Sequence, residues 1–235
     1  MKENIFLIGA NKELVELEGE PYNSEDLLQS LLEDYPKLIP GSQINPDNPC
    51  RWLLVTREKT IADDNKHIRW ALDHLLLDQD GIPTLIEVKR SSDTRLRREV
   101  VGQMLDYAAH ASIHWSVEEI IKTFEKDCTK KGIDSDVKLA EFLEDERIDS
   151  DSFWGKVEAN LSLGKLRLIF VADVFPSELK RVIEFLNIQM NPAEVLGIEI
   201  KQYTGEGLKT LVPRTVGLTQ QAQELKSQRT KKKWN

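Results

Sequence analysis

Two strongly apolar segments joined by a short polar turn constrain the fold of this chain most. Residues 70–78 and 84–89 have the leucine, isoleucine and valine content of buried strands. Residues 79–81, Gln-Asp-Gly, separate them and have the composition of a tight turn. The sequence therefore predicts a β-hairpin at this point, with both of its strands inside the protein.

The length of the turn decides which side chains of this hairpin share a face. If the loop has three residues, with Gly81 in the left-handed conformation, Asp78 pairs with Ile82 and Asp73 pairs with Glu87. Directly paired residues lie on one face, with Cβ atoms about 5 Å apart. A two-residue loop would place Asp73 on the opposite face unless a bulge corrects it. The register of this hairpin is thus a test of whether the two carboxylates meet.

The other elements alternate between strands and helices. Ser24 is the expected N-cap of a helix that ends before Pro36, and Asp93 the expected cap of a long helix that reaches about His110. Further strands are expected at 5–8, 14–17, 52–56, 166–172 and 195–203, and further helices between 117 and 143 and at 177–190. This order predicts an α/β or α+β fold with a mixed central sheet flanked by helices.

The same pattern predicts how the chain is organised. Residues 1–220 are expected to form a single domain that opens with a small β-hairpin. Its core is expected at 24–111 and 166–213, with a helical, acidic insertion at about 115–164 and a basic tail or linker at 221–235. No apolar segment approaches the length of a membrane span, and the first residues lack a signal-peptide core, so we expect a cytoplasmic protein. A homodimer is compatible with the sequence.

Charge is unevenly distributed along the chain. The formal net charge is -8 and the sequence pI is about 5.2, which alone argues against a nucleic-acid partner. Residues 89–98, however, contain five basic residues and one acid, and residues 226–233 contain five basic residues and no acid. Residues 134–151 contain eight acids and two basic residues. We therefore expect a local basic surface beside an acidic segment that stays in water.

The predicted hairpin carries charged residues where its strands are otherwise apolar. Glu87 and Lys89 are two residues apart on a strand, so they point to one face, and Asp73 joins them in the three-residue register. Hard cations such as Mg²⁺ need oxygen ligands, and one or two carboxylates suffice to hold them on a substrate phosphate. The alternative is a cross-strand salt bridge on an exposed hairpin face. Burial of these groups would cost free energy unless they pair or bind a metal, which favours the functional interpretation.

The helix after the hairpin adds two polar residues at a suggestive spacing. Gln103 and Tyr107 are four residues apart and share a helix face, from which both could reach the strand end that bears Lys89. Such residues are also ordinary at the boundary of an amphipathic helix. Their position after the acid-and-lysine pattern makes them informative.

Together these motifs resemble the PD-(D/E)xK nuclease superfamily, whose fold is that of restriction endonucleases, and the QxxxY pair resembles its RecB-type branch. The segments LDHLLLDQDGIPTLIEVKRSSD and EVVGQMLDYAAH are also similar to the nuclease domain of the mismatch-cutting endonucleases of archaea and actinobacteria. The resemblance is strong over residues 24–111 and loose in the strands after residue 166. One departure is Leu72, which stands where the family usually has proline.

The resemblance implies a role for each residue of the motif. It implies that Asp73, Glu87 and the carbonyl of Val88 bind Mg²⁺ or Mn²⁺, and that Lys89 positions or activates the attacking water. Gln103 and Tyr107 would support the site or touch DNA. An early helical glutamate often completes such sites, and Glu25 is the best match, with Glu33 as the alternative. The neighbouring basic residues are expected to bind the phosphate backbone, namely Arg90, Arg95 and Arg98.

The sequence thus predicts a metal-dependent deoxyribonuclease, in DNA restriction, defence or repair. It is equally compatible with endonuclease and exonuclease activity. Two other hypotheses remain: a catalytically inactive nucleic-acid-binding module that retained the fold, and a protein-interaction module that uses its acidic surface. The intact set of two acids and a lysine argues against both, because an inactive site has no physical reason to keep charges between apolar strands.

Overall fold

The computed structural model describes residues 3–62, 68–92, 99–144 and 149–218. Its strands are β1 (Asn4–Ile8), β2 (Leu14–Glu20), β3 (Leu53–Ala62), β4 (Ile68–Leu77), β5 (Pro83–Val88), β6 (Arg167–Ala172), β7 (Glu194–Gly205) and β8 (Leu208–Val216). Its helices are α1 (Glu25–Asp34), the 3-10 turn η1 (Pro36–Leu38), α2 (Gly41–Ile44), α3 (Glu99–His114), α4 (Val117–Lys130), α5 (Ser135–Leu143), α6 (Ser150–Ser162) and α7 (Ser177–Gln189). The predicted fold class is confirmed: the chain forms a mixed sheet flanked by helices.

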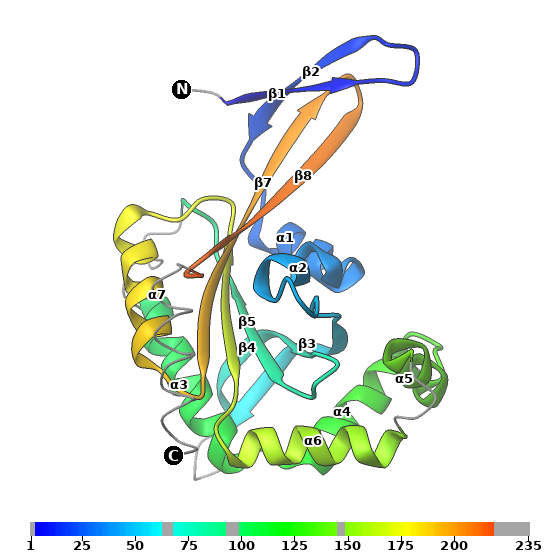
Figure 1. The fold of residues 1–235 in the computed structure, drawn as a ribbon, viewed down its shortest axis with the longest axis vertical. Coiled ribbons are helices and arrows are strands. Elements are labelled where there is room, and N and C mark those ends of the chain that lie inside the picture. Colours follow the sequence, from blue (N-terminus) through cyan, green and yellow to red (C-terminus); the bar gives the residue numbers. More distant parts are fainter. Residues whose placement is uncertain (1–2, 63–67, 93–98, 145–148, 219–235) are drawn as a thin grey trace.

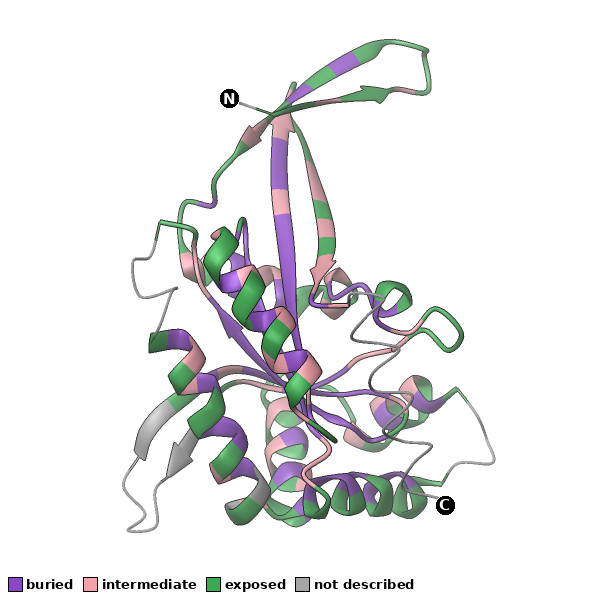
Figure 2. Cartoon of the chain, turned by 60° about the vertical axis from the view of Figure 1, so that its left-hand side comes forward, coloured by how far each residue is buried: buried purple, intermediate pink, exposed green. Residues whose placement is uncertain are grey.

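The strands form one eight-stranded sheet in the order β1-β2-β7-β6-β5-β4-β3, with β8 paired to β7. The three central strands β5, β6 and β7 are parallel, and the remaining pairs are antiparallel. β5 and β6 are buried along their whole length, which explains their nearly continuous apolar sequence (Figure 2). Polar groups at the ends of these strands therefore lie next to a dry core.

Side chains of β4 and β5 alternate between two hydrophobic cores. Leu75, Leu77 and Leu85 belong to the larger core, to which helices α3 to α7 contribute. Leu76 and Ile86 belong to the smaller core, to which α1 contributes. Because alternate residues of a strand point to opposite faces, a side chain's position along β4 or β5 determines which helices it meets.

The predicted insertion is helical in its described part and consists of α4, α5 and α6 (Figure 1). Its aromatic residues pack together: the ring centroids of Phe124 and Trp154 are 6.1 Å apart, and those of Phe153 and Trp154 are 5.2 Å apart. All three belong to the larger core, together with residues of β4 and β5. The insertion thus packs against the sheet and does not form a core of its own.

The predicted amino-terminal hairpin is present as β1 and β2, and it joins the main sheet. β2 pairs with the end of β7, through Glu18 to Glu20 opposite Gln202 to Thr204. The β1–β2 hairpin therefore lies at the far end of the long β7–β8 ribbon, away from the helices (Figure 1). β8 was not predicted, and α3 continues four residues past the expected end at His110. The expected cap of that helix, Asp93, lies outside the described residues.

Among the described residues, no helix combines the length and apolar character that crossing a bilayer requires.

Candidate active site at the carboxyl ends of the central strands

The hairpin of β4 and β5 has the three-residue loop that brings the two carboxylates together. The amide of Asp78 donates to the carbonyl of Ile82 at 3.4 Å, and Gly81 has a φ of 72°. The ladder runs from Leu77 opposite Pro83 to His74 opposite Ile86. The predicted register is confirmed for these pairs, which end one residue short of Asp73 and Glu87. Asp73 and Glu87 lie close enough together for the charge of Asp73 to raise the pKa of Glu87.

Glycine is required at position 81 for two reasons. Its positive φ lies in the left-handed region, which residues with a Cβ rarely adopt. A Cβ there would also lie 3.0 Å from the Cβ of Lys156 and from the amide nitrogen of Val157, both on α6. The turn that sets the register is therefore fixed by its own conformation and by packing against the insertion.

Short polar contacts join the side chains at the end of this hairpin. Oδ2 of Asp73 accepts a hydrogen bond from the amide of Val88 at 2.6 Å. Nζ of Lys89 lies 2.8 Å from Oε1 of Glu87 and 3.1 Å from Oε1 of Glu25, and it donates to the carbonyl of Val88 at 2.9 Å. One ammonium thus bridges carboxylates from a strand and from a helix.

Of the two glutamates considered on α1, Glu25 is the one at the site. Ser24 caps this helix as predicted, since its Oγ accepts from the amide of Leu27 at 3.0 Å, and the cap places Glu25 in the first turn. Glu33 lies two turns further along and pairs instead with Arg57 at 3.4 Å and Lys131 at 2.8 Å. Glu25 therefore remains the candidate ligand, and Glu33 belongs to a different ion-pair cluster.

Burial sets the electrostatics of this cluster. Glu87 is only 2% exposed, and its Oε2 has no hydrogen-bond partner among the described residues. Burial, and then the charge of Asp73, raises the pKa of Glu87; burial also raises the pKa of Asp73. Burial acts to lower the pKa of Lys89, but Glu87, Asp73 and Glu25 together raise it, so the lysine stays charged. Burial therefore favours the protonated forms of Asp73 and Glu87, and a cation bound beside them would favour their ionised forms.

Gln103 and Tyr107 form a second layer behind the carboxylates. Nε2 of Gln103 donates to the Tyr107 hydroxyl, which donates to the carbonyl of Ala71 at 3.0 Å. Tyr107 is fully buried, and burial, followed by the nearby charge of Glu87, raises its pKa. Since Ala71 is two residues before Asp73 on β4, this chain of hydrogen bonds ties α3 to the strand that carries Asp73.

The predicted DNA-binding arginines are only partly within the described chain. Arg90 follows Lys89 and is partly exposed. Arg95 and Arg98 lie outside the described residues, so their contact with DNA stays a prediction.

Sequence reasoning missed Asp173, which directly follows β6. It accepts hydrogen bonds from the amide and hydroxyl of Ser91 at 2.7 and 2.8 Å and so anchors the segment after Lys89. An acid immediately after the apolar run at 167–172 was the available signal, since parallel strands end at the same edge of a sheet.

The oxygen atoms at this site suit a hard divalent cation that also contacts the substrate. Three carboxyl groups lie near one ammonium, and a divalent ion bound among them would favour their ionised forms. The orphaned oxygen of Glu87 is an oxygen ligand of the kind Mg²⁺ prefers. The described residues contain no group of three or more His, Cys, Asp or Glu side chains arranged to hold a metal by themselves.

No family model, no curated protein and no solved structure matches the chain. The functional conclusion therefore depends on the chemistry of the site.

Proposed function

We propose that this protein is a Mg²⁺- or Mn²⁺-dependent DNA nuclease that hydrolyses phosphodiester bonds. The observation that carries the proposal is the convergence of Asp73, Glu87 and Lys89 at the end of a buried hairpin, with one Glu87 oxygen left unpaired. A purely structural ion pair would be expected to satisfy both oxygens, because an unpaired buried acceptor costs about 1–3 kcal/mol. A ligand-binding site can tolerate that free-energy cost while no ligand is bound.

Each residue has a distinct part in the proposed reaction. Asp73, Glu87, Glu25 and the carbonyl of Val88 would hold the cation. When bound, the cation stabilises charge on the phosphate and lowers the pKa of a coordinated water. Lys89 supplies a fixed positive charge next to the reacting phosphate or the attacking water. Gln103 and Tyr107 position the strand that bears Asp73, through the Ala71 carbonyl.

DNA is proposed as the substrate because basic residues follow the site directly. Residues 89–98 hold five of them in a chain of net charge -8, so the positive charge is local to the strand end. Neutralising phosphates releases counterions, which makes binding steeply salt-dependent. Arg95→Ala with Arg98→Ala should weaken binding of every sequence alike. A binding constant that does not change with salt would contradict this part of the proposal.

The direct test is cleavage of plasmid DNA and of linear single- and double-stranded DNA with Mg²⁺, Mn²⁺ or EDTA. We expect cleavage with either cation and none with EDTA. Circular plasmid separates endonuclease from exonuclease activity, because only an endonuclease cuts a substrate without ends. Binding without cleavage under every cation would instead support the inactive nucleic-acid-binding module.

A further inference from the structure

A groove between helix α4 and the edge strand β3 concentrates positive charge outside the candidate active site. Its volume is about 360 Å³. The charged residues that line it are Arg57 and Glu58 from β3 and Lys122, Lys126, Asp127 and Lys130 from α4. Four basic residues thus stand against two acidic ones, in a chain whose formal net charge is -8. This α4–β3 groove is therefore a local basic surface on an acidic protein.

The three lysines of the groove form a stripe along one side of α4. Lys122, Lys126 and Lys130 follow one another at intervals of four residues, so they lie on successive turns of the same side. All three are exposed, and none of the ion pairs in the described part of the chain involves them. Like charges at this spacing destabilise a helix, and Lys126 has a lysine one turn away in each direction. An anionic partner would relieve this repulsion.

The other charged groups of the groove are largely engaged elsewhere. Asp127 pairs with Lys131 at 2.9 Å, on the same helix. Arg57 pairs with Asp26 and, at 3.4 Å, with Glu33, both on α1. The uncompensated positive charge of the groove therefore lies mainly on the lysine stripe of α4.

The groove adjoins the candidate active site through the first turn of α1. Consecutive residues of that turn reach the two regions: Glu25 contacts the lysine of the site, and Asp26 contacts Arg57. In the sheet, Arg57 lies opposite His74, which directly follows Asp73. The Cα atoms of Arg57 and Asp73 are therefore at most about 9 Å apart. A DNA molecule held at the site can extend from there into the groove.

The dimensions of the stripe suit a nucleic-acid backbone. From Lys122 to Lys130 the helix rises by about 12 Å. One strand of duplex DNA advances by about 3.4 Å per nucleotide, so three or four of its phosphates cover the same length. Lysine is a flexible point charge, which binds phosphate without reading the base sequence.

We propose that the α4–β3 groove binds the phosphate backbone of the substrate DNA, beyond the segment held at the candidate active site. The proposal rests on the proposed function, because it extends the path of the DNA away from the phosphate that would be cleaved. It also gives the helical insertion a part in binding. The acids at 134–151 follow α4 in the chain, and α4 itself presents a basic side to the DNA.

The test measures how tightly a DNA duplex of mixed sequence binds in EDTA as the salt concentration changes, which separates binding from cleavage. Lys126→Gln with Lys130→Gln removes two charges at exposed helical positions. Each phosphate contact contributes about 0.9 to the slope of log affinity against log salt, so we expect the slope to become shallower by about 1.8 and binding at about 0.1 M salt to weaken tenfold or more. The matched control is Lys12→Gln with Lys209→Gln, in the β1–β2 turn and on β8, on the ribbon that lies away from α4 (Figure 1). It changes the net charge equally and should bind like wild type.

A wild-type slope and affinity in Lys126→Gln with Lys130→Gln overturn the proposal. An equal loss in the control overturns it as well, because the effect would then be one of net charge, and so does wild-type protein that does not bind the duplex. The melting temperature of the α4 variant should not fall, since the change removes like-charge repulsion. If it does fall, Lys126→Arg with Lys130→Arg, which keeps both charges, should retain the wild-type slope, and a shallower slope there would contradict the proposal.

Failure of the proposed function is a separate result, namely absence of cleavage with Mg²⁺ and Mn²⁺ while the change in salt slope remains. Where DNA is cleaved, the α4 variant should retain the wild-type single-turnover rate at saturating DNA, because its lysines bind the backbone away from the reacting phosphate. A slower rate at saturation would place the lysines at the reaction and contradict the proposal.

Discussion

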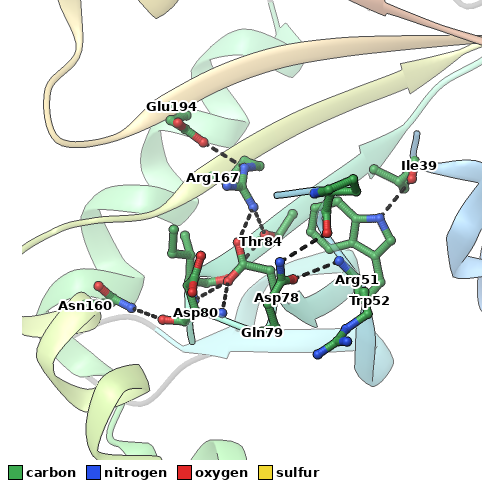
Figure 3. A network of polar contacts seen from close by, with 12 residues as sticks. Ile39, Arg51, Trp52, Asp78, Gln79, Asp80, Thr84, Asn160, Arg167 and Glu194 are labelled. Carbon is green, nitrogen blue, oxygen red and sulfur yellow. Dashed lines mark hydrogen bonds and ion pairs between the residues drawn. The ribbon is translucent and has the colours of Figure 1, made fainter. Parts of the chain in front are cut away.

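Both ends of the β4–β5 hairpin bury charged side chains, but the two ends differ in how completely those side chains are paired. At the turn end, Arg167 lies between Asp78, at 2.9 Å, and Glu194, at 2.7 Å (Figure 3). Nη1 of the arginine also contacts the hydroxyl of Thr84 at 3.4 Å, and its guanidinium lies 5.5 Å from the centre of the Trp52 ring. At the other end, the carboxylate of Glu87 keeps one oxygen without a partner among the described residues.

The two ends differ in whether every buried carboxylate oxygen has a hydrogen-bond partner. The other oxygen of Asp78 accepts from the amides of Asp80 and Ile82 at 3.0 and 2.9 Å, so both of its oxygens are satisfied. Burial acts to lower the pKa of Arg167, and the two carboxylates more than offset it. In contrast, burial raises the pKa of both Asp73 and Glu87. The closed network at the turn, in which both oxygens of Asp78 are paired, stabilises the turn. The open site at the other end leaves one oxygen of Glu87 unpaired, which costs stability and is characteristic of a functional site.

The largest expected effect is at Glu87. Glu87→Gln removes a proposed metal ligand and should reduce cleavage by about 10³-fold or more, since metal assistance provides several kcal/mol. The same change removes a buried carboxyl group whose pKa is raised in the folded state, so the melting temperature should rise by about 2–4 °C. Mn²⁺ should raise the melting temperature of wild-type protein and leave that of the variant unchanged. A cleavage assay tests the first expectation, and calorimetry with and without Mn²⁺ tests the other two; a less stable variant would mean that Glu87 is structural.

The next largest effect is expected at Arg167, in the closed network at the turn. Arg167→Met leaves Asp78 buried and unpaired, and should destabilise the fold by about 3–5 kcal/mol. Activity per folded molecule should be retained at low temperature. Denaturant unfolding measures the loss, and Arg181→Met, at an exposed position on α7, is the matched control. Adding Asp78→Asn should recover part of the stability, because the asparagine keeps an acceptor for the two turn amides and removes the charge. A double variant as unstable as the single one would contradict this account.

The hairpin could be predicted from sequence because its determinants are local. A left-handed glycine sets the loop length, and the period-two pattern then fixes which residues share a face. The choice between Glu25 and Glu33 could not be made this way. They are eight residues apart, about 12 Å along α1, and only the packing of that helix decides which end meets Lys89.

Other features were beyond sequence reasoning for a different reason. β8 is exposed or half-buried along its length and pairs with β7 alone, so it shows no strand pattern. The contact of Ser91 with Asp173 joins residues 82 positions apart, and Gln202 gives no sign of its burial in the sequence. Such contacts arise from the order of the parallel strands, which no local signal encodes.

Lys89 should separate catalysis from binding. Lys89→Ala should slow cleavage by about 10²–10³-fold, because a preorganised charge at the reacting group contributes about that much. DNA binding should be nearly unchanged, since this ammonium is one of many positive charges near the strand. Lys89→Arg should not restore activity, because a planar guanidinium does not replace a compact ammonium. Single-turnover cleavage and equilibrium binding at the same salt provide the measurement, with Lys156→Ala on α6 as control. If Lys89→Ala cleaves DNA at the wild-type rate, Lys89 acts only as an ion-pair partner.

The smallest expected effect is at the pair behind the carboxylates. Tyr107→Phe removes the hydroxyl that links Gln103 to the carbonyl of Ala71, and should cost about 1 kcal/mol of stability. Cleavage should fall by less than about tenfold, because Tyr107 acts on Asp73 only through the backbone of β4. Gln103→Leu should have an effect of similar size, through the same hydroxyl.

The double variant decides whether this pair acts as one unit. If Gln103 and Tyr107 position β4 together, Tyr107→Phe with Gln103→Leu should cleave no more slowly than the worse single variant, since the second change removes a bond already lost. If each side chain touches DNA by itself, the two losses should multiply. Wild-type metal affinity in all three variants, measured by Mn²⁺ titration, would further show that the pair does not orient Asp73. The cycle therefore tests whether the open site depends on supporting hydrogen bonds from a neighbouring helix.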